Sequence, residues 1–158
     1  MASAEQFVTI GAGEGLFAAP VAQVQEILDL APIAHVPRSA PSLLGLIDVR
    51  GRSVPVLDLR DLLGVPRGED GVHTRVIVLT LGGAGGGPQG GRVVGLKSDR
   101  VFEVTALDAD ALDPAPGGGE EAGCGGAIRG IGRRNGAFVT VLDVERLVES
   151  ELGAGASI

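Results

Sequence analysis

The sequence has few aromatic residues and one cysteine. Of its 158 residues none is Trp or Tyr and four are Phe, whereas 44% are hydrophobic. The core must therefore consist mainly of Val, Leu, Ile and Ala, and the β-branched members of this set favour strands. Cys124 alone cannot form an intramolecular disulfide, although a chain of this length can bury a continuous core without one. These features predict one domain held together by packing.

Positive charge and long apolar runs are also lacking. The net charge is -7, and no Lys/Arg cluster provides the basic surface that nucleic-acid binding requires. The longest apolar run, Leu16–Ala22, contains Pro20 and is far shorter than the roughly 20 residues of a membrane span. The initial MASAEQ lacks the basic and apolar regions of a secretory signal. We therefore expect a cytoplasmic protein that neither binds nucleic acid nor inserts into a membrane.

Short apolar segments between turn residues make up most of the sequence. Nine such segments at this spacing predict an all-β barrel or sandwich. They are 7–10, 16–19, 43–49, 53–57, 75–81, 92–96, 101–104, 127–131 and 137–142.

Helical patterns are fewer. Proline at a first turn and apolar residues on one helical face predict a helix over Pro20–Leu28. A short turn is expected after Asp58, which can cap it, and a closing helix from Asp143 to about Leu152. The Pro/Gly-rich stretches 82–91 and 113–126 cannot bury much apolar surface and are predicted to be mobile loops.

A search for catalytic, metal or cofactor motifs finds none that fits its context. Residues 85–90 match the spacing G-x-G-x-x-G, but the following segment is predicted to be a strand, whereas a dinucleotide site needs a helix there. Asp108, Asp110 and Asp113 lack the glycine and glutamate of a calcium-binding loop. We therefore expect no catalytic residue, no metal and no cofactor. A binding function is favoured over an enzymatic one.

Four ordered segments resemble the CheW family of chemotaxis coupling proteins. FAAPVAQVQEIL at 17–28 contains the V-x-E-I element, and LLGLIDVRGRSVPVLDLRDLL at 43–63 contains the family's R-G turn and V-P-V-L-D-L run. RVVGLKSDRVFEV at 92–104 and GIGRRNGAFVTVLDVERL at 130–147 match the later strands and closing helix. The resemblance spans nearly the whole chain in the family's order.

The resemblance implies a mostly β fold with two packed, intertwined five-stranded SH3-like β-barrels forming a single domain over residues 1–158. It also implies a non-enzymatic adaptor that couples the cytoplasmic tip of a chemoreceptor to the regulatory domain of a CheA-type histidine kinase. Such a protein would be recruited from the cytoplasm to membrane-associated receptor arrays.

The resemblance further suggests which residues contact partners, in or near a groove between the barrels. The candidates are Val24, Glu26, Ile27, Leu46, Arg50, Asp99, Arg100 and Val101. For the apolar candidates the alternative is ordinary core packing. Glu26 could be a solvated charge at a helix end. Arg50 could be a structural partner of Asp48 or Asp99, or it could contact a partner protein directly.

Other positions are expected to shape the backbone. Gly45 and Gly51 are expected at turns, Asp58 at a helix cap, and Pro55 at a barrel edge or bulge because it lacks a ladder donor. Arg100 departs from the family, which often has glycine there, so a long cation could narrow the groove.

Two alternatives remain open. The chain could be a small β-barrel enzyme or a ligand-binding module whose site follows no known motif. It could also be the same adaptor in a non-flagellar sensory pathway.

Overall fold

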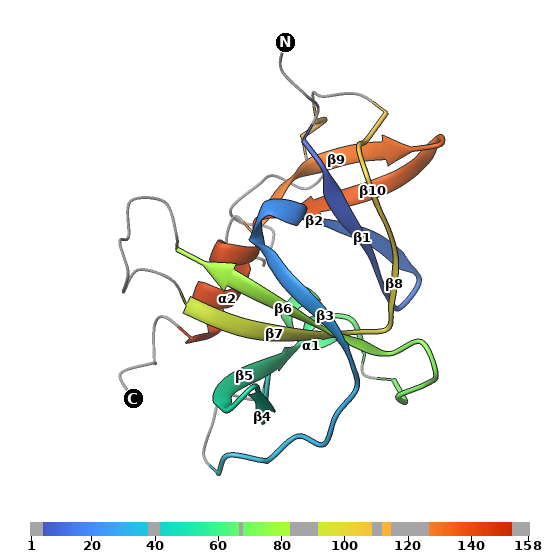
Figure 1. Cartoon of the computed structure of the whole chain (residues 1–158). Helices are drawn as coiled ribbons and strands as arrows, with labels where there is room; N and C mark the ends of the chain where they lie inside the picture. Colours follow the sequence, from blue (N-terminus) through green and yellow to red (C-terminus); the bar gives the residue numbers. More distant parts are fainter. Residues whose placement is uncertain are drawn as a thin grey trace.

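Ten strands form two five-stranded sheets in the computed structural model (Figure 1). The structure describes residues 5–37, 42–66, 68–82, 92–108, 112–114 and 127–152, with side chains described to residue 149. Cys124, Asp110 and nearly all of the two predicted mobile loops lie outside the described residues. The nine predicted strands are all present, and a tenth, β3, was not predicted.

The first sheet, sheet A, is made of strands from both ends of the chain in the order β8-β1-β2-β10-β9. Its strands are β1 (Phe7–Ala12), β2 (Gly15–Pro20), β8 (Arg100–Thr105), β9 (Ile128–Arg134) and β10 (Ala137–Leu142).

The second sheet, sheet B, is made of the strands between them in the order β3-β6-β7-β5-β4. Its strands are β3 (Val24–Asp29), β4 (Leu43–Val49), β5 (Arg52–Asp58), β6 (Arg75–Leu81) and β7 (Arg92–Ser98). Each sheet has one parallel pair, β2 with β10 and β5 with β7.

The ladders of the described strands do not close either sheet, so the barrel description stays a prediction. Two other links join the outer strands of sheet B: a bridge pair between Ala34 and Leu46, and an ion pair between Glu26 and Arg50. In sheet A the backbone N–H of Asp108 donates to the carbonyl of Arg133 at 2.7 Å.

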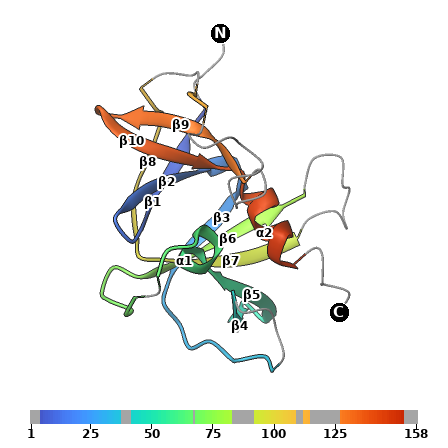
Figure 2. The same cartoon turned by 180° about the vertical axis from the view of Figure 1, so that it is seen from behind.

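The helices are short. η1 (Val21–Gln23) is a single 3-10 turn, α1 (Leu59–Leu63) follows β5, and α2 (Val144–Leu152) follows β10, so the predicted short turn and closing helix are confirmed. Figure 2 shows α1 and α2 on the same side of the molecule. Leucines of α1, and a leucine and valines of α2, belong to the largest hydrophobic cluster, which also contains residues of both sheets. We call this cluster the inter-sheet core.

The predicted helix over Pro20–Leu28 is wrong. After the 3-10 turn the chain becomes β3, whose ladder to β6 contains a bulge between Val24 and Glu26. An extra residue in a bulge makes side chains three positions apart share a face, which imitates helical spacing. Glu26 is consequently a strand residue and not a charge at a helix end.

The predicted turn and cap residues have specific roles. Gly51 follows Arg50 in the turn between β4 and β5, and both have positive φ, 83° and 52°. Asp58 accepts a hydrogen bond from the Arg60 amide at 3.0 Å and caps α1. Gly45 lies within β4 and not at a turn, contrary to expectation; its φ is 148°, and a Cβ there would collide with the carbonyl of Ala34. Glycine at position 45 therefore permits the chain after β3 to approach β4.

Pro55 does not lie on an edge strand, contrary to expectation, because β5 lies between β7 and β4. Its partner across the ladder is Leu46, whose N–H and C=O both bond to Ala34 on the other side of β4. The Leu46–Pro55 pair therefore exchanges no ladder bonds, and the missing proline donor costs no hydrogen bond to β4.

Candidate functional site

Two outer strands, β3 and β8, present aliphatic side chains at the margin of the inter-sheet core. On β3, Val24 is opposite Leu79 and Ile27 is opposite Ile77, and both partners belong to that core. Residues paired across a ladder point to the same face. The bulge at Gln25 thus directs both Val24 and Ile27 toward the inter-sheet core.

Strand β8 repeats this arrangement in the other sheet. Val101 is opposite Ile10 and Val104 is opposite Val8, again with an extra residue in the outer strand. Ile10 and Val8 are fully buried in the inter-sheet core. The hydroxyl of Thr9 holds the bulge, donating to the carbonyl of Glu103 at 3.2 Å and accepting from its amide at 3.1 Å.

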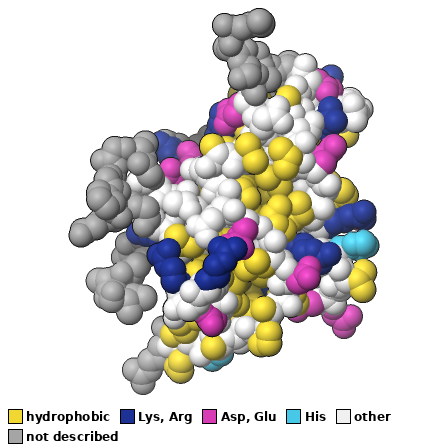
Figure 3. Space-filling model, in the orientation of Figure 1, with side chains coloured by type: hydrophobic (Ala, Val, Ile, Leu, Met, Phe, Trp, Pro, Cys, Tyr) yellow, Lys and Arg dark blue, Asp and Glu magenta, His cyan; other side chains and the backbone are white. Residues whose placement is uncertain are grey.

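Val24, Ile27, Val101 and Val104 together are here named the aliphatic strip. Val24 and Val101 are partly buried and pack against the inter-sheet core, whereas Ile27 and Val104 are 40% and 54% exposed. Figure 3 shows hydrophobic side chains in a band down the middle of the face on which Figure 1 draws β3. Exposed aliphatic surface at the edge of a core is typical of a protein-binding surface.

Glu26 and Arg50 form a bidentate ion pair; on β3, Glu26 is opposite Val78 and points to the face away from Val24 and Ile27. Arg50 Nη1 and Nη2 donate to the two carboxylate oxygens at 2.8 and 3.0 Å. The Glu26 side chain is only 18% exposed, whereas that of Arg50 is 75% exposed. Arg50 therefore has a structural partner, but the predicted partners Asp48 and Asp99 are both wrong.

Asp48 and Asp99 form hydrogen bonds with other groups. Asp48 accepts a hydrogen bond from the Gly51 amide at 2.8 Å within the turn. Asp99, in the connection between β7 and β8, accepts from Arg60 Nε at 2.8 and 2.9 Å and from Nη2 at 2.5 Å. The Gly13 amide donates to the same carboxylate at 2.7 Å. Asp99 thereby links α1, which follows sheet B, to the β1–β2 turn of sheet A.

The electrostatics of this link favour the charged form of Asp99. Partial burial would raise the pKa of its carboxyl group, but the hydrogen bonds from Arg60 and Gly13 and the positive charges of Arg60 and Lys97 outweigh it, so the pKa lies below its ordinary value. The hydrogen bond to Asp99 also raises the pKa of Arg60.

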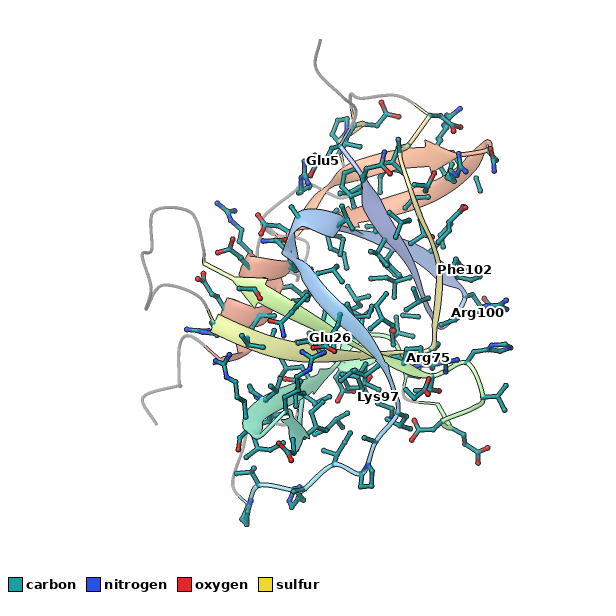
Figure 4. All side chains as sticks on the ribbon, viewed as in Figure 1. Glu5, Glu26, Arg75, Lys97, Arg100 and Phe102 are labelled. Atoms are coloured by element: carbon teal, nitrogen blue, oxygen red, sulfur yellow. The ribbon has the colours of Figure 1, made fainter. Side chains whose placement is uncertain are left out.

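Arg100 and Leu46 are not brought into the aliphatic strip. Arg100 is opposite Gly11, on the face of β8 away from Val101, and its guanidinium lies 4.9 Å from the ring centre of Phe102. Figure 4 shows Arg100 and Phe102 together on the side of β8 away from β3. Arg100 therefore does not narrow the strip. Leu46 lies on β4, the opposite outer strand from β3.

Sequence reasoning missed Val104, Arg60 and Phe102. Val104 has the same i+3 relation to Val101 that Ile27 has to Val24, which would have indicated a repeated strip. Arg60 gave no sequence pattern of its own, because its contact with Asp99 joins segments far apart in the chain.

Within the described parts of the chain, no helix has the length and apolar character needed to cross a membrane, and no group of three His, Cys, Asp or Glu side chains could hold a metal ion. Two five-stranded sheets of matching topology define a small β-sheet protein that exposes an aliphatic strip.

Comparison with known proteins identifies the family. The chain matches the CheW-like domain over residues 6–152 and belongs to the CheW family. It is 28% identical over 151 residues to the chemotaxis protein CheW of Klebsiella aerogenes, spanning 93% of this chain and 83% of that protein. It is 25% identical over 147 residues to CheW of Helicobacter pylori, spanning 92% and 82%.

A solved structure shows the same fold. The scaffolding protein TtCheW from Thermoanaerobacter tengcongensis superposes with a TM-score of 0.77 at 22% identity, covering 93% of this chain and 89% of that one. The predicted mostly β fold with two five-stranded units agrees with this likeness.

Proposed function

We propose that this protein is a non-enzymatic coupling adaptor of a chemosensory array. The aliphatic strip receives the cytoplasmic tip of a chemoreceptor, and a second surface binds the regulatory domain of a CheA-type histidine kinase. The protein would act in the cytoplasm and be recruited to receptor arrays at the membrane. The names of its relatives, chemotaxis protein and scaffolding protein, support this assignment.

The observation that carries the proposal is the exposure of Ile27 and Val104 on matching bulged strands. Their cross-strand partners are buried, so each side chain extends the inter-sheet core toward solvent. A partner that covered both side chains would bury apolar surface, and this burial stabilises a complex by about 25 cal/mol per Å². A receptor tip with aliphatic side chains at helical spacing would satisfy this requirement.

Arg50 acts in this proposal as a positioning residue. Its guanidinium holds Glu26, which lies on β3 between Val24 and Ile27. We further propose that each sheet forms the wall of a small SH3-like barrel, supported in sheet B by the Ala34–Leu46 bridge. Slow amide exchange at Ala34 and Leu46 would support closure, and rapid exchange at both would contradict it.

The test is binding of the chemoreceptor cytoplasmic fragment from the same genome, measured by isothermal titration calorimetry. Ile27→Lys and Val104→Lys place a charge where the partner must remove water, and each should weaken binding by at least about tenfold. Val72→Lys is the matched control, because Val72 is 83% exposed and lies outside the strip. Unchanged affinity in both strip variants would refute the assignment of the strip.

Binding to the kinase is tested separately, with the isolated regulatory domain of the CheA-type kinase encoded next to this gene. The proposed second surface predicts that this domain binds Ile27→Lys and wild-type protein equally. The same adaptor in a non-flagellar pathway would give the same binding results, and the receptors and motility genes next to this gene distinguish the two.

A further inference from the structure

A pocket of about 590 Å³ opens in sheet A beside β8, on the face opposite to the aliphatic strip. Gly11, Gly15 and Leu16 line it from the β1–β2 hairpin, Arg100 and Phe102 from β8, and Arg134 from the end of β9. Its size lies within the roughly 300–1,000 Å³ of typical small-molecule sites. Neither the proposed receptor strip nor the ion pair of Glu26 uses these residues.

The corresponding place in sheet B is occupied by side chains. Ile10 and Leu79 are equivalent, because each is opposite the first valine of a bulged outer strand. The next residues are therefore also equivalent, Gly11 in sheet A and Thr80 in sheet B. Thr80 donates a hydrogen bond to Gln25 at 3.1 Å across the bulge. Glycine at the equivalent position in sheet A lets the Phe102 ring lie close to the backbone, since a Cβ on Gly11 would approach that ring to 3.1 Å.

The face of sheet A that lines the pocket is apolar. Leu16 is opposite Gly11 in the β1–β2 ladder, points to the same face and lines the pocket. Phe102 is 50% exposed and also lines it. A leucine side chain beside a half-exposed phenylalanine suits a planar ring.

The charges in the pocket favour an anionic group on that ring. Two carboxylates in the lining are already bound: Asp99 to Arg60, and Glu103 to Arg134 at 3.3 Å. Among the described residues Arg100 forms no ion pair, and it stacks on Phe102. Its guanidinium is therefore free to bind a carboxylate in bidentate geometry. Glu14 at the rim is the one opposing charge of the lining without an arginine partner in the described chain.

We propose that this pocket binds a small aromatic carboxylate. The ring lies against Phe102 and Leu16, and the carboxylate accepts hydrogen bonds from Arg100. Because β8 carries Phe102 on one face and Val104 of the strip on the other, this ligand would bind directly behind the receptor-binding surface.

The experiment is a titration of the ¹⁵N-labelled full-length protein with naphthalene-2-carboxylate, followed by NMR. Naphthalene-2-methanol, which has the same ring without the charge, is titrated in parallel. We expect saturable shifts of the Gly11, Gly15 and Leu16 amides. Phe102→Ala should weaken both probes by about tenfold or more. Arg100→Gln should weaken the carboxylate by about tenfold and the alcohol by less than about twofold.

The chain offers a matched pair of controls. Arg133 lies over the Phe138 ring at the same 4.9 Å, and Phe138 is 64% exposed, but neither residue lines the pocket. Arg133→Gln and Phe138→Ala should leave both affinities within about twofold. Glu14→Gln should tighten carboxylate binding and leave alcohol binding unchanged, because it removes the opposing charge.

Three results would overturn the proposal. One is the absence of saturable shifts at the glycine amides up to the solubility limit of the probe. Another is an equal loss of affinity in the Arg133 and Phe138 variants, which would indicate general adsorption to exposed rings. The third is a loss of binding in Ile27→Lys, which would place the probe on the aliphatic strip. The amide spectrum of each variant reports in the same experiment that the protein is folded.

Discussion

The segment β4–β5–α1 and the segment β9–β10–α2 have the same backbone geometry in different sheets. From Gly45 to Gly130 the offset is 85 residues, and the same offset relates Leu46 to Ile131, each of which forms an isolated bridge, to Ala34 and to Asp113 respectively. Gly45 and Gly130 have φ of 148° and 158°. At both positions a Cβ would collide with the carbonyl oxygen of the bridged segment.

The agreement extends to the helix that follows each hairpin. Asp58 caps α1 and Asp143 caps α2, each accepting a hydrogen bond from a backbone amide at the start of its helix. The amides of the same aspartates bond to the carbonyls of Ser42 and Ala127, again 85 residues apart. At this offset seven of the 21 residues of 43–63 and 128–148 are identical, and they include the capping aspartates and two glycines of each segment.

The turns are where the two segments differ. Arg50 and Asn135 have nearly the same φ, 52° and 53°, and each precedes a glycine. Asn-Gly suits a two-residue hairpin turn with positive φ, whereas arginine is strained there. Arg50 is retained in a strained position and forms the ion pair with Glu26, which lies on β3 between Val24 and Ile27 of the aliphatic strip. In the proposed function the first turn therefore positions the strip and the second turn is structural.

The largest expected effect is on the shared glycines. Gly45→Ala should lower the free energy of unfolding by about 3 kcal/mol or more, because it combines an unfavourable φ with a steric clash against backbone. Gly130→Ala should cost slightly less, since its Cβ would lie 2.7 Å from the carbonyl oxygen of Asp113. Urea denaturation measures both.

Gly71→Ala is the control, because Gly71 has no positive φ and nothing lies within 4 Å of an added Cβ. It should change stability by less than about 0.5 kcal/mol. If Gly45→Ala and Gly130→Ala were equally neutral, the two bridges would not require glycine and the comparison would fail.

The second effect concerns the helix caps. Asp58→Ala should cost about 1–2 kcal/mol and Asp143→Ala about 1 kcal/mol. The larger loss is expected at Asp58, which is 6% exposed, so that its removal leaves the Arg60 amide in a drier environment. Equal losses in thermal unfolding, or a larger loss for Asp143→Ala, would contradict this ranking.

Much of this architecture could be predicted from the sequence. Nine strands, α1, α2, the Asp58 cap and the Arg50–Gly51 turn follow from local patterns and are present. Strand β3 was misassigned because its bulge gives Val24 and Ile27 the spacing of a helix face. Bulges depend on the partner strand, so the local sequence does not reveal them.

The contacts of the candidate site were harder to predict. Val24 and Ile27 share a face as expected, but a bulge in a strand, and not a helix, brings them to it. The pairs Glu26–Arg50 and Asp99–Arg60 depend on how segments distant in sequence are brought together. The offset of 85 residues was present in the sequence, and it would have identified Gly130 and Asn135 as counterparts of Gly45 and Arg50.

A third prediction tests the link between the sheets. Asp99→Asn should lower stability at pH 7 by about 1 kcal/mol, a modest value because the Asp99 side chain is 32% exposed. The pKa of Asp99 is lowered by folding, so its contribution is present above the unfolded pKa of about 4 and is lost as pH falls through the folded pKa. The difference between wild type and variant should therefore shrink below about pH 4. A difference independent of pH in urea denaturation would show that the lost contribution is not that of a charge.

The smallest effect on stability is expected from exchanging the two turn residues. Arg50→Asn loses an exposed ion pair and relieves turn strain, so its stability should stay within about 0.5 kcal/mol of wild type. Asn135→Arg introduces strain without an acidic partner and should cost about 0.5–1 kcal/mol. Binding of the receptor fragment should show the reverse order, with a loss in Arg50→Asn and none in Asn135→Arg. If Asn135→Arg weakened binding as much as Arg50→Asn, both turns would contact the partner, and the functional difference between the two segments would be wrong.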